Sequence, residues 1–409
     1  MSISRVKILQ RVSTLLAFVA VAAFAQSSAL QIARESAQSR PRGAPQSDEA
    51  GTLWTWRNEQ ALLISARPST SSKEITGTFL QHRVNAGATA VIALEKLGAE
   101  NLRDDKSGLA LRWFNRDGQP LGTHFIAWHN DDPLPQFVMN RSGSHVVCAE
   151  PAVARATFLD QTGQVLAQNF LFEDATYSNE RPLFLAASAE HFYVLSQRAP
   201  STLETGHAPV LFCFSLEGQE QWRRELAPGT AGNLALSPRG NWLMASRYTV
   251  AANGVVSTIA IFDTQGHAHA TLSGLFRTVV FARDETQALL LDRRQLRCVR
   301  IPQGERLWQF ALTSKEEMFV AAAATHDLHS YIVLAAQSNF KQQRFIFEQA
   351  RLLAFDHDGQ HQFELAIPEA LVQPALAISA SGRSLQLAGD GLFQNYKLIV
   401  PAAANSTEQ

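Results

Sequence analysis

The sequence has few cysteines and, beyond its first 25 residues, no long apolar segment. Cys148, Cys213 and Cys298 are the only cysteines among 409 residues, and each lies inside an apolar, strand-like run. An odd and scattered set does not form a disulfide framework, so we expect small buried side chains, although one pair could still bridge. A bilayer span needs roughly 20 apolar residues. We therefore expect no membrane span in the mature chain.

The chain also lacks an excess of charge of either sign. Its 36 basic and 37 acidic residues give a formal net charge of −1. Surfaces that bind nucleic acid or anionic membranes need clustered positive charge, so the composition argues against both classes of partner. Hydrophobic residues make up 46% of the chain and charged residues 18%, which is a normal globular balance.

Local catalytic and metal-binding motifs are missing as well. The sequence has no Gly-x-Ser-x-Gly motif, phosphate loop or dinucleotide fingerprint. His267 and His269 would place two imidazoles on one strand face, but no third ligand is nearby in sequence. We predict no metal and no cofactor, and we favour a protein that is not an enzyme. A site assembled from distant segments would leave no such motif, so the enzyme question stays open.

Residues 1–25 have the composition of an export signal. Arg5, Lys7 and Arg11 precede the apolar run Val12–Ala25, which ends in the small-residue pattern AFA. The alternative is a membrane anchor, but a run of about fourteen residues is short for a span of roughly 20. We expect cleavage after Ala25 and a periplasmic or secreted protein.

Two turn motifs recur with one period. An Asp/Asn/Glu-x-(x)-Gly turn follows aromatic-ended strands, and a second hairpin, of which SPRG around Gly240 is an example, falls between them. Gly143 and Gly240 are 97 residues apart, and Gly240 and Gly382 are 142 apart, which is two and three periods of about 48. The glycines of the first motif, with the same average spacing, are Gly118, Gly163, Gly218, Gly266, Gly304 and Gly359.

Four short strands fit each period, which predicts an all-β fold, a β-propeller of four-stranded antiparallel blades over residues 52–400. Six turns and a further blade opening at Gly382 give seven blades, with an N-terminal strand from Gly51–Ala66 closing the last. Six or eight blades remain possible because Ile75–Arg112 fits the period poorly, and part of it is compatible with a short helix. Residues 26–51 are expected to be a disordered leader and 401–409 a disordered tail.

The segments FSLEGQEQW and IPQGERLW resemble repeats of quinoprotein-type β-propellers, and LALSPRGNWLMAS resembles the hairpin of bacterial WD-repeat-like propellers. The resemblance implies an exported propeller in which Trp222 and Trp308 pack between blades. It covers residues 110–390 and implies the fold only, because the docking tryptophan is mostly replaced and adjacent cysteines are missing. The replacements at the corresponding positions are Gly122, Ala167, Ala270 and Phe363.

Nearly all the long loops connect the second to the third strand of a blade or one blade to the next. In an up-and-down blade these loops emerge on one face, and function tends to lie on such loops. Exposed aromatic residues beside arginines suit protein or glycan contacts. The residues expected on this face are Trp128, His129, Tyr177, Arg181, Arg247 and Tyr248.

These observations favour a monomeric, non-catalytic exported propeller that binds a protein or other macromolecule, such as a glycan, through its long-loop face. The alternative is a hydrolase or lactonase-like propeller with its active site at the mouth of the central channel. Convergence of two carboxylates or histidines at the axis would favour the enzyme, and an axis lined with alanine, valine and serine would favour the binding protein. A structural member without a ligand is a third possibility.

Overall fold

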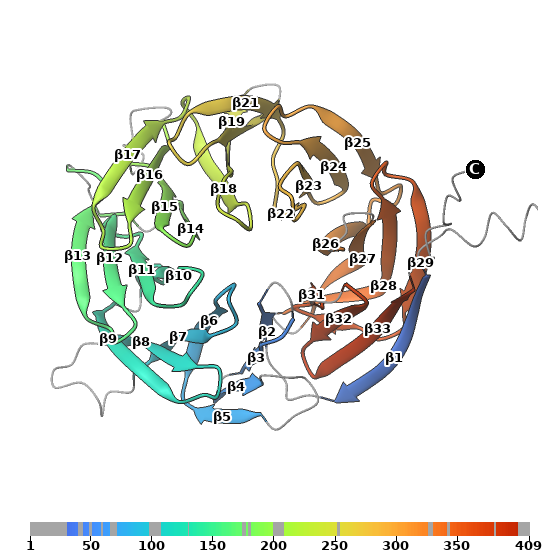
Figure 1. Cartoon of the computed structure of the whole chain (residues 1–409), viewed down its shortest axis with the longest axis horizontal. Coiled ribbons are helices and arrows are strands. Elements are labelled where there is room, and N and C mark those ends of the chain that lie inside the picture. The colour runs from blue at the N-terminus through green and yellow to red at the C-terminus, as the bar shows by residue number, and fades with distance from the viewer. Residues whose placement is uncertain are drawn as a thin grey trace, which may run out of the picture.

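The computed structural model describes residues 31–39, 44–48, 51–58, 60–65, 72–97, 108–129, 131–173, 177–178, 181–198, 208–251, 254–325, 330–341, 344–379 and 382–399. Every regular element in these residues is a β-strand, and the strands form eight antiparallel sheets arranged in a ring (Figure 1). The protein is therefore an all-β propeller with eight blades. The predicted count of seven blades is wrong.

The blades are numbered here from the N-terminus, and the strands of each are given from the axis outward. Blade 1 contains β2 (Ala44–Ser47), β3 (Trp54–Arg57), β4 (Ala61–Ser65) and β5 (Lys73–Thr76), and blade 2 contains β6 (Phe79–Val84), β7 (Ala90–Lys96), β8 (Gly108–Asn115) and β9 (Pro120–Ala127). Blade 3 contains β10 (Gln136–Met139), β11 (His145–Glu150), β12 (Arg155–Asp160) and β13 (Val165–Phe170), and blade 4 contains β14 (Leu183–Ala187), β15 (His191–Ser196), β16 (Val210–Ser215) and β17 (Glu220–Glu225).

Blades 5 to 8 follow the same plan. Blade 5 contains β18 (Thr230–Leu236), β19 (Leu243–Ala251), β20 (Gly254–Phe262) and β21 (Ala268–Ser273), and blade 6 contains β22 (Thr278–Phe281), β23 (Gln287–Leu291), β24 (Gln295–Arg300) and β25 (Arg306–Ala311). Blade 7 contains β26 (Glu317–Ala324), β27 (Ser330–Lys341), β28 (Arg344–Asp356) and β29 (His361–Ile367), with β30 (Leu371–Val372) paired to β28. Blade 8 contains β31 (Ala375–Ile378), β32 (Ser384–Gly389), β33 (Leu392–Ile399) and β1 (Gln31–Ser39).

An N-terminal strand closes the ring, but it is not the predicted one. β1 pairs antiparallel with β33, from Gln31 opposite Ile399 to Ser39 opposite Leu392. The segment proposed for this role, Gly51–Ala66, instead forms β3 and β4, the two middle strands of blade 1. β1 lies in the polar segment 26–51, for which disorder was expected. An outermost strand faces solvent on one side and needs few apolar residues, so its composition does not reveal it.

The missing blade lies in the region that fitted the period poorly. Blade 1 lacks the Asp-x-x-Gly turn, and the connection between β7 and β8 in blade 2 is long. The segment that was compatible with a short helix is the strand β7, whose residues Ala90 to Leu94 are buried. A short apolar run buried on both sides has no alternation, so periodicity alone does not separate strand from helix.

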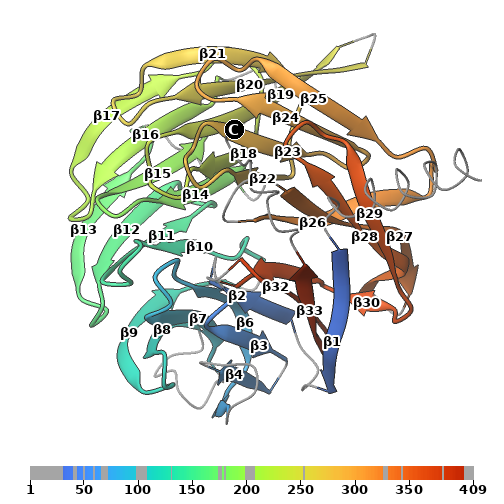
Figure 2. The same cartoon turned by 45° about the vertical axis from the view of Figure 1, so that its right-hand side comes forward.

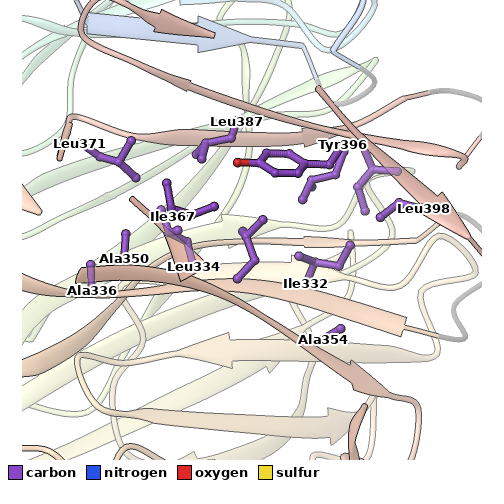
Figure 3. Packing of buried hydrophobic residues seen from close by; sticks show 13 residues of the cluster. Ile332, Leu334, Ala336, Ala350, Ala354, Ile367, Leu371, Leu387, Tyr396 and Leu398 are labelled. Atoms are coloured by element: carbon purple, nitrogen blue, oxygen red, sulfur yellow. The ribbon is translucent and has the colours of Figure 1, made fainter. Parts of the chain in front are cut away.

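The hydrophobic core lies between the blades. The two middle strands of each blade pack against both neighbouring sheets, as in β16, where residues 211–214 are all buried. Figure 3 shows the layer between blades 7 and 8, where Ile332 and Leu334 of β27 lie close to Leu387 of β32 and Tyr396 of β33. The outer strands alternate exposed and half-buried residues, as in β13. Burial on both sides explains the continuous apolar runs of the middle strands.

The recurring Asp-x-x-Gly motif forms the turn between the third and fourth strands. In blade 5, Asp263 Oδ1 accepts hydrogen bonds from the backbone N–H groups of Gln265 and His267, both at 2.9 Å. Gly266 completes the turn with a φ of +78°, which a residue without a Cβ adopts at no steric cost. Asn115, Asp160 and Asp356 accept the same pair of bonds in blades 2, 3 and 7.

These turns also dock each blade on the previous one. Trp222 of blade 4 donates from Nε1 to the Thr264 carbonyl of blade 5 at 2.8 Å, and Trp308 of blade 6 donates to the His357 carbonyl of blade 7 at 2.9 Å. The predicted packing of both tryptophans between blades is confirmed. Where the position holds a small residue, the next turn packs against that residue: a Cβ on Gly304 would lie 2.9 Å from the Cβ of Ala270.

Candidate functional site

The connectivity gives the propeller two different faces. The tight-turn face carries the connections between first and second and between third and fourth strands, as in the turns 140–145 and 160–164 of blade 3. The loop face carries the other connections, including the long ones predicted from the sequence.

Three of the predicted residues lie in or beside one cluster on the loop face. Trp128 packs partly buried against the core of blades 2 and 3, and its Nε1 donates to the Asp132 carbonyl at 3.1 Å. The backbone N–H of His129 lies 3.4 Å from the Asp132 carboxylate. The hydroxyl of Tyr177, from the next inter-blade loop, donates to the same carboxylate. Asp132 thus joins two neighbouring loops, and Lys96 lies 5.8 Å from the Trp128 ring centroid.

Arg181 has a structural position. It is only 4% exposed, and its guanidinium donates to the carbonyls of Pro151 and Ala152. Burial lowers the pKa of this arginine because desolvation disfavours the charged form. The Arg181 guanidinium is hydrogen-bonded to backbone carbonyls in the protein interior. It is therefore not exposed to a partner, although the sequence predicts an exposed arginine at this position.

Arg247 and Tyr248 lie on β19 of blade 5, two blades away from the Asp132 cluster. Arg247 donates to the Pro228 carbonyl at 2.7 Å, and Tyr248 pairs with Thr230 on one side and Ser257 on the other. Both are half-buried at the base of a hairpin. Five of the six predicted residues therefore lie at two separate places on the loop face, and the sixth, Arg181, is buried.

The β19–β20 hairpin, which carries Arg247, extends beyond the other two strands of blade 5. β18 pairs with β19 only as far as Tyr248, and β20 pairs with β21 only from Thr258 onward. Beyond these residues β19 and β20 pair with each other alone, with Val250 opposite Val255. Val250 is 80% exposed, and Val255 and Val256 are exposed as well. Figure 2 shows this hairpin extending past the neighbouring strands.

Blade 7 has a second long hairpin, formed by β27 and β28. Its pairing continues to Lys341 opposite Arg344, whereas β26 pairs with β27 only as far as Gln337. Phe340 and Phe345 are 65% and 60% exposed, and their ring centroids lie 5.1 Å apart. Ion pairs of Lys341 with Glu348 at 2.8 Å and of Arg344 with Asp390 at 3.2 Å hold the hairpin. β30 also pairs with β28 at Ile346 and Phe347, within the extended part of the hairpin.

These apolar residues are not among the six residues predicted for the loop face, which are aromatic residues, a histidine and arginines. Both hairpins are strands up to their tips, and VVS and FIF around Val255 and Phe345 have strand character. Exposed β-branched and aromatic residues at the tips of two hairpins were therefore the available signal.

The central channel has a cavity of about 630 Å³ at its tight-turn end. Its walls are the ends of the inner strands β18, β22, β26 and β31, with alanine, valine, leucine, isoleucine and phenylalanine side chains. Arg141, Arg239 and Arg283 from three tight turns also line it. Among the described residues that line this cavity, none is a carboxylate or a histidine.

The cysteines and the His267–His269 pair have ordinary roles. All three cysteines are buried and unpaired, so no disulfide joins them. Burial raises the pKa of the Cys213 thiol to about 12 and that of Cys298 to about 11. Both imidazoles lie 3.1 Å from Asp263 Oδ2, in the blade 5 turn. In the described part of the chain, no group of three or more His, Cys, Asp or Glu side chains is arranged to hold a metal ion.

The fold defines the chain as a β-propeller that resembles WD40 propellers. A solved structure titled "Structure of Dos1 propeller" has a TM-score of 0.58 and 10% sequence identity, over 90% of this chain and 95% of that one. The C-terminal WD40 domain of Sif2 has a TM-score of 0.55 and 10% identity, over 90% of this chain and 99% of that one. Identity this low shows the fold alone. No protein-family profile and no curated protein sequence matches the chain.

Among the described residues, no helix is long and apolar enough to cross a membrane. The quinoprotein part of the sequence resemblance and the export signal have no counterpart in these comparisons, and residues 1–30 lie outside the described part of the chain. Both stay predictions.

Proposed function

We propose that the protein is a non-catalytic binding scaffold that holds a protein partner against its loop face, with the tips of the β19–β20 and β27–β28 hairpins as the contact points. The observation that carries the proposal is the exposure of Val250, Val255, Val256, Phe340 and Phe345 at two tips on the same face. Large apolar side chains gathered at a surface mark interaction sites more often than single scattered ones do.

The chemistry of the tips favours a protein over a glycan. The blade 5 tip, TVAANGVVS, has no charged residue, and its valines offer no hydrogen bond. Burying such side chains contributes roughly 25 cal/mol per Å² of apolar surface, which an apolar protein surface supplies and a hydrated sugar does not. Phe340 and Phe345 present two rings that a partner side chain can pack against.

The hairpins also offer backbone hydrogen bonds. Beyond Gln337, β27 pairs with β28 but, within the described residues, has no strand on its other side. Free edges of this kind accept an extended segment of another chain. The ion pairs of Lys341 and Arg344 hold the blade 7 hairpin in place. A partner therefore meets a preorganised surface and loses less entropy on binding.

The test compares two double variants in affinity capture of partners with the full chain. Phe340→Ser with Phe345→Ser removes the blade 7 tip. Phe125→Ser with Phe170→Ser is the matched control, because these residues are 69% and 67% exposed but lie on the outer strands β9 and β13. We expect one protein captured by the wild type to be lost with the tip variant and kept with the control. Equal recovery by both variants, or binding only to a glycan array, contradicts the proposal.

Export remains part of the proposal. The basic residues before Val12–Ala25 and the AFA pattern support cleavage after Ala25 and a periplasmic or secreted location. Mass spectrometry of the mature protein is expected to find Gln26 as the first residue, and a retained N-terminus would contradict this. The expectation of a monomer stays a prediction.

The hydrolase alternative required polar side chains that converge at the axis. The described lining of the channel cavity supplies apolar side chains, Thr325 and three arginines. No observation therefore favours the hydrolase over the binding scaffold.

A further inference from the structure

The cavity at the tight-turn end of the channel combines an apolar wall with a positively charged rim. Leu236, Val280, Ala323 and Leu376 contribute half-buried apolar side chains, one from each of the inner strands β18, β22, β26 and β31. Its volume of about 630 Å³ lies within the range of roughly 300–1,000 Å³ that is typical of small-molecule sites. The cavity is therefore large enough for a ligand, and apolar side chains line its wall beside the arginine rim.

The rim is formed by arginines from tight turns of blades 3, 5 and 6. The guanidinium of Arg141 donates to the Pro238 carbonyl, so this side chain reaches from blade 3 to the blade 5 turn and lies beside Arg239. The buried carboxylate of Glu285 accepts hydrogen bonds from the Arg239 backbone N–H and, at 2.7 Å, from Asn241 Nδ2. These two hydrogen bonds connect the blade 5 turn to the blade 6 turn, which carries Arg283.

The rim arginines lack counter-charges. Arg239 and Arg283 are exposed, and within the described residues neither guanidinium has a hydrogen bond or an ion pair. The nearby acids have other partners: Glu285 holds the blade 5 turn, and Asp284 accepts from the Thr286 backbone N–H and hydroxyl at 3.0 and 2.9 Å. Neither carboxylate lines the cavity. Arginine stays charged at any physiological pH, so the rim presents three positive charges to whatever enters.

We propose that this cavity binds a small organic anion in which a carboxylate is joined to an apolar body. The carboxylate lies among Arg141, Arg239 and Arg283, where charge-assisted hydrogen bonds are available, and the apolar body enters the channel against Leu376 and Val280. The carboxylate comes either from a free amphiphile or from the C-terminus of an apolar peptide. This site lies on the face opposite the hairpins and is independent of the proposed partner-binding function.

Calorimetric titration of the full chain at low salt tests the ligand chemistry. We expect octanoate to bind with one site per chain, and 1-octanol and acetate each to bind at least about tenfold more weakly, because each lacks one half of the recognition. Acetyl-Ala-Leu-Leu with a free C-terminus, compared with its amide, separates the two sources. Tighter binding than octanoate assigns the site to a peptide terminus, and weaker binding assigns it to a free amphiphile.

Two variants test the residues. Arg239→Gln and Arg283→Gln are each expected to weaken octanoate binding about tenfold, which is the loss expected for a hydrogen bond to a charged group. Arg116→Gln, an exposed arginine in the outer turn of blade 2 on the same face, removes the same charge and is expected to change the affinity less than about twofold. Circular dichroism confirms that each variant is folded, and Arg283→Gln carries the test if Arg239→Gln is not.

Three results would overturn the proposal. These are the absence of measurable octanoate binding, equal affinity for octanoate and 1-octanol, and a loss with Arg116→Gln as large as that with Arg283→Gln.

Discussion

The two faces of the propeller differ in how their connections are built. On the tight-turn face, side-chain oxygens of Asp263 and its equivalents accept backbone N–H groups, and a glycine with positive φ ends the turn. On the loop face, the connections vary in length, and two of them continue as paired hairpins with exposed valines and phenylalanines. The regular turns therefore hold the blades in a ring, whereas the connections of the loop face vary in length and carry the proposed contact residues.

The largest effect is expected when the strand that closes the ring is removed, because both faces depend on a closed ring. Deletion of residues 1–40 removes β1 and leaves the edge of β33 unpaired. We expect loss of cooperative unfolding and aggregation, because an exposed edge pairs with other chains. Thermal unfolding and size-exclusion chromatography measure this. Deletion of residues 1–30 keeps β1 and is the control. A truncated chain without β1 that unfolds like the control would show that closure does not depend on β1.

The second-largest effect is expected on the free energy of unfolding when one methyl group is added on each face. A Cβ on Gly266 would lie 2.9 Å from Cε3 of Trp222, whereas a Cβ on Gly254 at the blade 5 tip would meet nothing within 4 Å, and both glycines have positive φ. Gly266→Ala is expected to lower the free energy of unfolding by about 2–4 kcal/mol, from overpacking and backbone strain. Gly254→Ala is expected to cost about 1 kcal/mol, from strain alone. Chemical denaturation measures both, and equal losses would remove the distinction between the faces.

The smallest expected effect is the acid sensitivity of the tight-turn face. Partial burial raises the pKa of Asp263, but hydrogen bonds from the His267 backbone and from the imidazoles of His269 and His267 outweigh this and lower it to about 2. The folded state therefore binds fewer protons than the unfolded state, so this contribution is present above pH 3.8 and is lost as the pH falls through about 2. It amounts to less than about 1 kcal/mol because these hydrogen bonds lie in a surface turn, where solvent screens the interaction with the exposed His267 imidazole.

Denaturation curves from pH 6 to pH 2 check this prediction. Asp263→Asn keeps the turn acceptor and is expected to flatten the pH dependence. Unchanged pH dependence in this variant would show that Asp263 does not contribute.

The repeated part of the fold could be predicted from the sequence, and the closing part could not. The Asp-x-x-Gly turns and the docking of Trp222 and Trp308 follow from local chemistry, namely a side-chain oxygen that caps two N–H groups and a glycine that admits positive φ. β1 could not be recognised, since an outer strand needs no apolar run. Blade 1 lacks the turn motif, so counting the motif gave one blade too few.

The candidate site, like the fold, could be predicted from the sequence only in part. The sequence placed the variable loops on one face correctly, because strand order fixes the face. It did not reveal that Arg181 is buried beneath a loop, or that Phe340 and Phe345 meet across a hairpin, since both depend on contacts between residues that only the folded backbone brings together. The rim arginines Arg141, Arg239 and Arg283 lie in the turns between the first and second strands of blades 3, 5 and 6. Their convergence at the axis follows only from ring closure.

Site-specific photocrosslinking in the producing cell tests whether a protein partner contacts the hairpin tips. A benzoyl-phenylalanine replaces Phe340 at the blade 7 tip in one version of the chain and Phe125 on outer strand β9 in another, two positions of similar exposure. We predict a single crosslinked product with one protein from position 340 and none from position 125. The same product from both positions, or none from position 340, would contradict partner binding through the hairpin tips.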